Sequence, residues 1–117
     1  MALNMGRISM QLEAFAMSVI VTVKISGDTD VFTKSLEERA DLFREVAERG
    51  RKAGAVHHQF GVGDGFILVV DEWDSADAFN AFFSDPELMG FIGSVGADPN
   101  VAPEITTVNA IDSPDKF

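Results

Sequence analysis

The sequence has no cysteine and no tyrosine, and only two of its residues are histidines. Without cysteine the chain can form no disulfide, no thiolate metal site and no cysteine nucleophile. Without tyrosine it lacks one common general acid. The two histidines and the carboxylates are therefore the first side chains to consider for any chemistry.

Positive charge is also scarce. Nine Lys and Arg residues stand against 19 Asp and Glu residues, which gives a formal net charge of −10. Because such a surface repels nucleic acid and anionic lipid, we expect no nucleic-acid partner and no membrane partner. No run approaches the roughly 18 apolar residues that a membrane-spanning helix needs. Together with the missing cysteines, these features favour a cytoplasmic protein.

The chain of 117 residues is long enough for one domain. A regular pattern begins only after Met17, so we interpret residues 1–16 as an N-terminal extension. Within it Ile8, Leu12 and Phe15 are spaced for a short helix. The domain is expected over residues 17–112, and residues 113–117 are expected to form a C-terminal tail.

Alternating or continuous apolar patterns predict strands over residues 18–26, 55–62, 66–73 and 104–111. A glycine-rich link, Gly63-Asp64-Gly65, joins the second and third strands as an antiparallel hairpin. Helical spacing predicts one long helix that is capped by Asp30 and ends at Gly50 or Gly54. A second helix, capped by Asp74, is followed by a further helical piece over 86–94.

The order strand-helix-strand-strand-helix-strand predicts a ferredoxin-like α+β fold, βαββαβ, with a four-stranded antiparallel sheet. Both helical segments should then cover the same face of the sheet. To that face we assign the residues with the most uniform aliphatic pattern, which are Val19, Val21, Val23, Ile25, Phe66, Leu68 and Val70. The opposite face then carries Ile20, Ile67, Val69 and Trp73.

That opposite face is too apolar to remain in contact with water, since exposed apolar area costs about 25 cal/mol per Å². A homodimer in which two sheets cover each other is the simplest remedy. The alternative is a monomer whose second face is covered by the N-terminal extension or the C-terminal tail. In the dimer we expect a ligand cavity between the sheet and its partner, lined by Thr22, Lys24, His57, Gln59, Asp71, Thr107 and Asn109.

The segment from Phe66 to Leu88 reads FILVVDEWDSADAFNAFFSDPEL. It resembles the dimeric α+β barrel proteins of the antibiotic biosynthesis monooxygenase type. In that family a strand ends in Trp, an acidic or Ser helix cap follows, and the next helix carries an aromatic residue where Phe79 lies. With the preceding strand, helix and hairpin, the resemblance covers residues 18–111.

The resemblance implies a dimeric α+β barrel that acts on or binds a small molecule. Members of this superfamily include cofactor-independent monooxygenases of polyphenolic aromatics, haem-degrading enzymes and haem-binding proteins. The family's Trp corresponds to Trp73. The pocket Asn of the oxygenase and haem-degrading members falls near Thr22, and the His on their second helix has no counterpart here. These departures argue against haem degradation and weaken the oxygenase assignment.

His57 and His58 are neighbours on a predicted strand, so their side chains point to opposite faces. The apolar set of that strand is Val56, His58, Phe60 and Val62, which leaves His57 and Gln59 on the cavity side. His57 could then act as the base that removes a phenolic proton, because histidine titrates near neutral pH. The alternative is that both histidines are half-exposed residues of an edge strand.

Trp73 can stack on an aromatic ligand, or it can serve as core packing and as a hydrophobic staple for the second helix. The phenylalanine-rich helix that follows, which includes Phe83, can be core or can roof a cavity. The acidic cluster of Asp71, Glu72, Asp74 and Asp77 is poorly arranged to bind a metal, since neighbouring carboxylates point apart. We therefore expect no metal site and no cofactor.

These patterns favour a cofactor-independent monooxygenase-like protein that acts on a small aromatic or polyphenolic molecule, in a cavity between the sheet and the helices of a homodimer. A second hypothesis is a non-catalytic dimer of the same fold that binds haem or another small hydrophobic molecule. A third is a structural dimer with a filled interior and no ligand.

Overall fold

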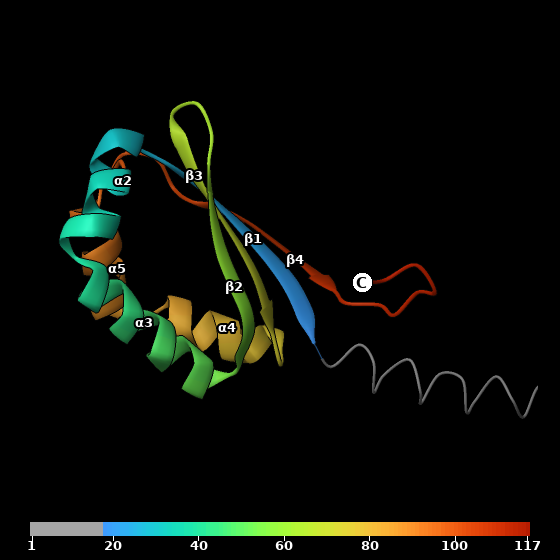
Figure 1. The fold of residues 1–117 in the computed structure, drawn as a ribbon. Coiled ribbons are helices and arrows are strands. Elements are labelled where there is room, and N and C mark those ends of the chain that lie inside the picture. Colours follow the sequence, from blue (N-terminus) through green and yellow to red (C-terminus); the bar gives the residue numbers. More distant parts are fainter. Residues whose placement is uncertain (1–17) are drawn as a thin grey trace, which may run out of the picture.

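The computed structural model describes residues 18–117, and the helix expected within residues 1–16 lies outside them. The strands β1 (Val19–Ser26), β2 (Ala55–Val62), β3 (Phe66–Trp73) and β4 (Glu104–Asn109) form one antiparallel sheet in the order β2-β3-β1-β4. The helices α2 (Thr29–Glu38), α3 (Ala40–Ala53), α4 (Ala76–Phe83) and α5 (Pro86–Ser94) gather on one side of the sheet (Figure 1). The ferredoxin-like α+β fold predicted from the sequence is confirmed.

The first helical segment differs from the prediction because it is two helices rather than one. Arg39, with φ −125° and ψ 33°, interrupts the helix between α2 and α3. Its guanidinium donates a hydrogen bond to the Ser94 hydroxyl at 2.8 Å and lies 5.3 Å from the centre of the Phe91 ring. The break therefore lies where the segment is anchored to α5. The helical spacing of apolar residues continues on both sides of Arg39, so the sequence pattern does not predict this break.

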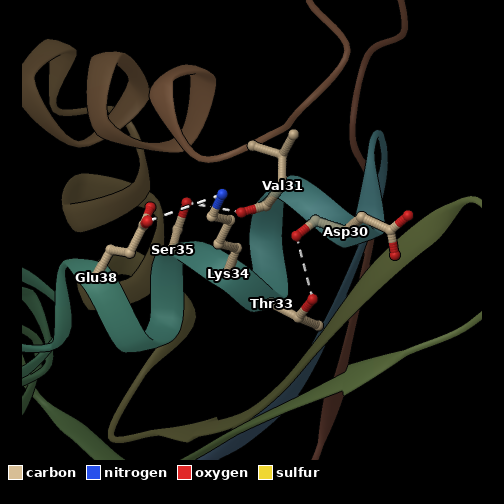
Figure 2. Close-up of polar contacts among 6 residues, drawn as sticks. All are labelled: Asp30, Val31, Thr33, Lys34, Ser35 and Glu38. Atoms are coloured by element: carbon tan, nitrogen blue, oxygen red, sulfur yellow. Dashed lines mark hydrogen bonds and ion pairs between the residues drawn. The ribbon is translucent and has the colours of Figure 1, made fainter.

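The cap of α2 also lies earlier than predicted. The Asp28 carboxylate, rather than that of Asp30, accepts hydrogen bonds from the amides of Asp30 and Val31, at 3.0 and 3.1 Å. The carboxylate thereby satisfies two of the free amides at the start of the helix. Within α2 the buried Ser35 hydroxyl donates to the Val31 carbonyl at 2.7 Å (Figure 2). This hydroxyl is therefore engaged within its own helix.

The second helical segment is capped as two pieces. Ser75, rather than the predicted Asp74, accepts a hydrogen bond from the Ala78 amide at 3.0 Å and caps α4. Pro86 occupies the first turn of α5, as the sequence predicted, and the structure adds Asp85 as the cap of this helix. No helix among residues 18–117 is long and apolar enough to span a membrane.

Strand pairing decides which residues face the helices. On β1 these are Val19, Val21, Val23 and Ile25, all of them buried. Directly opposite them on β3 lie Trp73, Asp71, Val69 and Ile67. The β3 assignment from the sequence is therefore wrong, because Ile67, Val69 and Trp73 belong to the helix-covered face. Phe66, Leu68 and Val70 belong to the other face.

The face of the sheet that carries no helix remains apolar in this corrected assignment. We call it the outer face, and its apolar residues are Ile20, Phe66, Leu68, Val70 and Val108. Ile20 and Val108 are 41% and 51% exposed. Thr22 and Lys24 lie between these apolar residues, and the Lys24 ammonium lies 4.6 Å from the centre of the Phe66 ring. The outer face is therefore still apolar enough to favour a partner, although its β3 residues differ from those predicted.

Candidate functional site: an aromatic cavity on the helix-covered face

A cavity of about 590 Å³ lies between the sheet and the helices. This volume is in the range of sites that bind small molecules. It lies on the helix-covered side of the sheet, not between the sheet and a partner as the face assignment had led us to expect. Aromatic side chains make up much of its wall, and they are Phe32, Phe43, Phe60, Trp73, Phe79, Phe82, Phe83 and Phe91.

These rings form two groups that pack edge to face or stack. In the first group the Phe60 ring lies 5.0 Å from the Phe32 ring and 6.0 Å from the Phe43 ring, measured between centres. In the second, the Trp73 ring lies 5.7 Å from Phe79 and 5.3 Å from Phe82. Such contacts hold each ring in a defined orientation. The cavity therefore has fixed aromatic walls that match a flat, apolar ligand.

A buried carboxylate, that of Asp71, lies among the residues of this wall. The side chain of Asp71 is only 8% exposed, and both of its oxygens are bonded. Oδ1 lies 2.7 Å from Nδ1 of His58, and Oδ2 accepts a hydrogen bond from Nε1 of Trp73 at 3.0 Å. The His58 ring also packs edge to face on Phe60, with 4.6 Å between centres. We call His58, Asp71 and Trp73 the polar triad.

The hairpin places these three residues together. Pairing of β2 with β3 sets His58 directly opposite Asp71, and Trp73 lies two residues further along β3 on the same face. A register irregularity between Ala55 and His57 then brings Ala55 opposite Trp73. The triad is therefore fixed by backbone pairing and does not depend on a loop.

The two histidines lie on opposite faces of the sheet, as predicted, but the cavity lies on the face of His58. His57 lies opposite Glu72, on the outer face, whereas His58 lies on the helix-covered face. The choice of His57 followed from grouping His58 with the apolar residues Val56, Phe60 and Val62 and from expecting the cavity on the opposite face. In the structure Asp71 is buried beneath the helices, and His58 and Trp73 satisfy it.

The other predicted site residues are divided between the two faces. Trp73 and Phe83 line the cavity together with Asp71. His57 and Gln59 border it, because the cavity wall follows β2 along this stretch. Thr22 and Lys24 lie on the outer face. Asn109 and Thr107 pair with helix-facing residues of β1 but are not part of the cavity wall.

His58 is the functional candidate that the sequence interpretation missed, and the hairpin itself held the signal. Counting back from the glycine turn, Val62 pairs with Ile67, and the same register places His58 across from Asp71. A histidine and an aspartate directly opposite each other on neighbouring strands form a plausible hydrogen-bonded pair. The alternation within each strand alone does not contain this pairing, which depends on the register between the two strands.

The acidic residues provide little that could hold a metal ion. Within residues 18–117 no group of three or more His, Asp or Glu side chains is arranged to hold a metal ion.

The C-terminal tail carries polar contacts of its own, outside the cavity wall. There the Ser113 hydroxyl lowers the pKa of Asp115, and a hydrogen bond to Asp112 raises the pKa of Lys116.

No protein-family model matches this sequence, and no curated protein matches it either. Solved structures do resemble it. SnoaB, a cofactor-independent oxygenase from Streptomyces nogalater, is 15% identical, with a TM-score of 0.58 over 86% of this chain and 100% of SnoaB. The ActVA-Orf6 monooxygenase of Streptomyces coelicolor, solved with the ligand nanaomycin D, is 16% identical, with a TM-score of 0.61 over 87% and 95% of the two chains.

A third similar structure is Rv0793 from Mycobacterium tuberculosis, which is 14% identical, with a TM-score of 0.55 over 84% of this chain and 99% of that one. Each of these likenesses covers nearly the whole of the similar chain, so it concerns a complete domain and not one motif. The chain thus shares its ferredoxin-like α+β fold with these solved oxygenase and monooxygenase structures.

Proposed function

We propose that this protein forms a homodimer, binds a small aromatic or polyphenolic molecule in the cavity between sheet and helices, and oxidises it with dioxygen without a cofactor. In the simplest such reaction a methylene carbon of the substrate becomes a carbonyl. One oxygen atom of dioxygen enters that carbonyl, and the other leaves as water with the two hydrogens.

The observation that carries this proposal is the composition of the cavity wall. Fixed aromatic rings suit the faces of a planar aromatic molecule, and the polar triad provides one point at which a hydroxyl group can be recognised. An electron-rich aromatic anion can react with dioxygen itself, so the protein would need only to bind, orient and deprotonate it. The fold it shares with a cofactor-independent oxygenase supports the same activity.

The homodimer is supported by the outer face of the sheet. Its apolar residues come from three strands: Ile20 on β1 lies opposite Val108 on β4, and β3 adds Phe66, Leu68 and Val70. A second copy can cover this face while leaving the cavity on the opposite side of the sheet undisturbed. The ligand site and the dimer contact would thus use the two faces of one sheet.

Oxygen consumption tests the activity. Purified protein is mixed with dihydroxyaromatic and anthrone-type substrates, and dioxygen uptake is followed with an electrode. With the anthrone-type substrate we expect the dioxygen consumed to match the quinone formed, mole for mole. A Val46→Phe variant, which places a ring into the cavity from α3, should lose most of this activity. The matched control is Val101→Phe, because Val101 is 44% exposed and is not part of the cavity wall.

Each result has a defined meaning. Uptake that is equal in both variants would contradict a reaction inside this cavity. Saturable ligand binding without any uptake would favour the non-catalytic binding protein. Absence of both binding and uptake would favour a structural dimer.

A further inference from the structure

We infer that His58 is the proton acceptor of this cavity, and that Asp71 is a positioning residue that keeps its Nε2 atom unprotonated. The inference rests on the proposed binding of a hydroxyaromatic ligand. It adds a specific base, a specific tautomer and a residue that selects that tautomer. It also replaces the role that the sequence suggested for His57.

The indole nitrogen of Trp73 can only donate a hydrogen bond. Trp73 is 2% exposed and donates to Oδ2 of Asp71, so this oxygen must act as an acceptor. The contact fixes the rotation of the carboxylate and presents Oδ1 to His58 at 2.7 Å. An ionised carboxylate accepts only, so the shared hydrogen must be bonded to Nδ1 of His58.

A neutral imidazole carries one hydrogen. If that hydrogen is on Nδ1, Nε2 has a free lone pair on the far side of the ring from Asp71. The His58 side chain is 37% exposed and belongs to the cavity wall, so a ligand can reach it. The arrangement has the form of a base that is oriented by a third group.

The step we assign to His58 is a proton transfer. The O–H bond of a bound phenol breaks, its electron pair remains on oxygen, and the hydrogen bonds to Nε2. The result is an imidazolium whose Nδ1–H faces the Asp71 carboxylate, beside a phenolate held among the aromatic rings. The carboxylate thus favours the charged ring that this step creates.

Asp71→Asn is the informative variant, because it keeps the shape and exchanges one acceptor for a donor. The Trp73 N–H would still need an acceptor and would therefore take the amide oxygen. The amide NH₂ would then face His58 and donate to Nδ1. His58 would have to carry its hydrogen on Nε2, where it could no longer accept a proton from the ligand.

The first measurement is the tautomer of His58, read from the ¹⁵N and ¹H signals of its ring. The chain has only two histidines, so a His57→Gln variant identifies the His58 signals. We expect hydrogen on Nδ1 in the parent and on Nε2 in Asp71→Asn. Hydrogen on Nε2 of the parent protein would overturn the inference, whatever the behaviour of the variant.

The second measurement uses a nitrophenol, whose anion absorbs visible light, at a pH where most of the free probe is neutral. We expect the parent to bind it with a shift to the absorption of the anion. Asp71→Asn and His58→Gln should bind it without that shift. A probe that binds the parent but stays neutral would contradict the role of His58. A probe that does not bind at all would contradict the proposed function instead.

Discussion

Asp71 is a buried carboxylate on the helix-covered face of the sheet, and two hydrogen-bonding partners offset the free-energy cost of its burial. Burying a charged group without hydrogen bonds is strongly unfavourable. Here His58 and Trp73 each provide one contact, so neither oxygen is left unpaired. Asp71 therefore stabilises the fold in addition to its proposed role in orienting His58. Substitutions can separate these two roles.

At this scale we predict that Asp71→Leu destabilises the fold more than Asp71→Asn. Leucine would leave the Trp73 N–H and the His58 ring without partners, which typically costs about 1–3 kcal/mol. Asparagine can still contact both. Urea unfolding measures the difference, and Asp64→Leu in the exposed hairpin turn is the control. Equal losses for the two Asp71 variants would mean that the hydrogen bonds contribute little.

At the scale of elements, two glycines should respond in opposite ways to substitution by alanine. Gly54 ends α3 with φ +127°, a conformation that other residues rarely adopt, and a Cβ there would lie 3.3 Å from that of Ala78. Gly93 lies within α5 on an exposed surface, with no atom within 4 Å of an added Cβ.

We therefore expect Gly54→Ala to lower the free energy of unfolding by about 1–3 kcal/mol. Gly93→Ala should raise it by roughly 0.5–1 kcal/mol, because alanine favours the helix. Thermal or urea unfolding of both variants provides the check. If the two substitutions change stability in the same direction, the account of the α3 end is wrong.

The sequence predicted the elements better than their faces. The predicted bounds of the strands and of α5 lie close to those in the structure, because alternation along a strand and a proline at the start of a helix are local signals. The face of β3 could not be decided locally, since Phe66, Leu68 and Val70 are as apolar as Ile67, Val69 and Trp73. The pairing of β3 with β1 decides this face, so the cavity was predicted on the wrong side of the sheet.

For the whole molecule, the apolar outer face leads to a prediction about assembly. Light scattering should report twice the 12.7 kDa chain mass at micromolar concentration. Ile20→Asp would bury a charge in the interface and should shift the population toward monomers.

The control is Val31→Asp, because Val31 is exposed to a similar extent on α2, at 43% against 41% for Ile20. This variant should remain dimeric. A parent protein that is monomeric at these concentrations would contradict the proposed homodimer but would leave the cavity in place.

The central claim is that the helix-covered cavity is where an aromatic ligand binds. Trp73 is the only tryptophan of the chain and lies in the cavity wall, so its fluorescence reports directly on occupation of that site. We predict saturable quenching by a hydroxyanthraquinone in the parent and in Val101→Phe, and its loss in the cavity-filling Val46→Phe. Quenching of the same strength and midpoint in Val46→Phe, or none in the parent, would contradict the account.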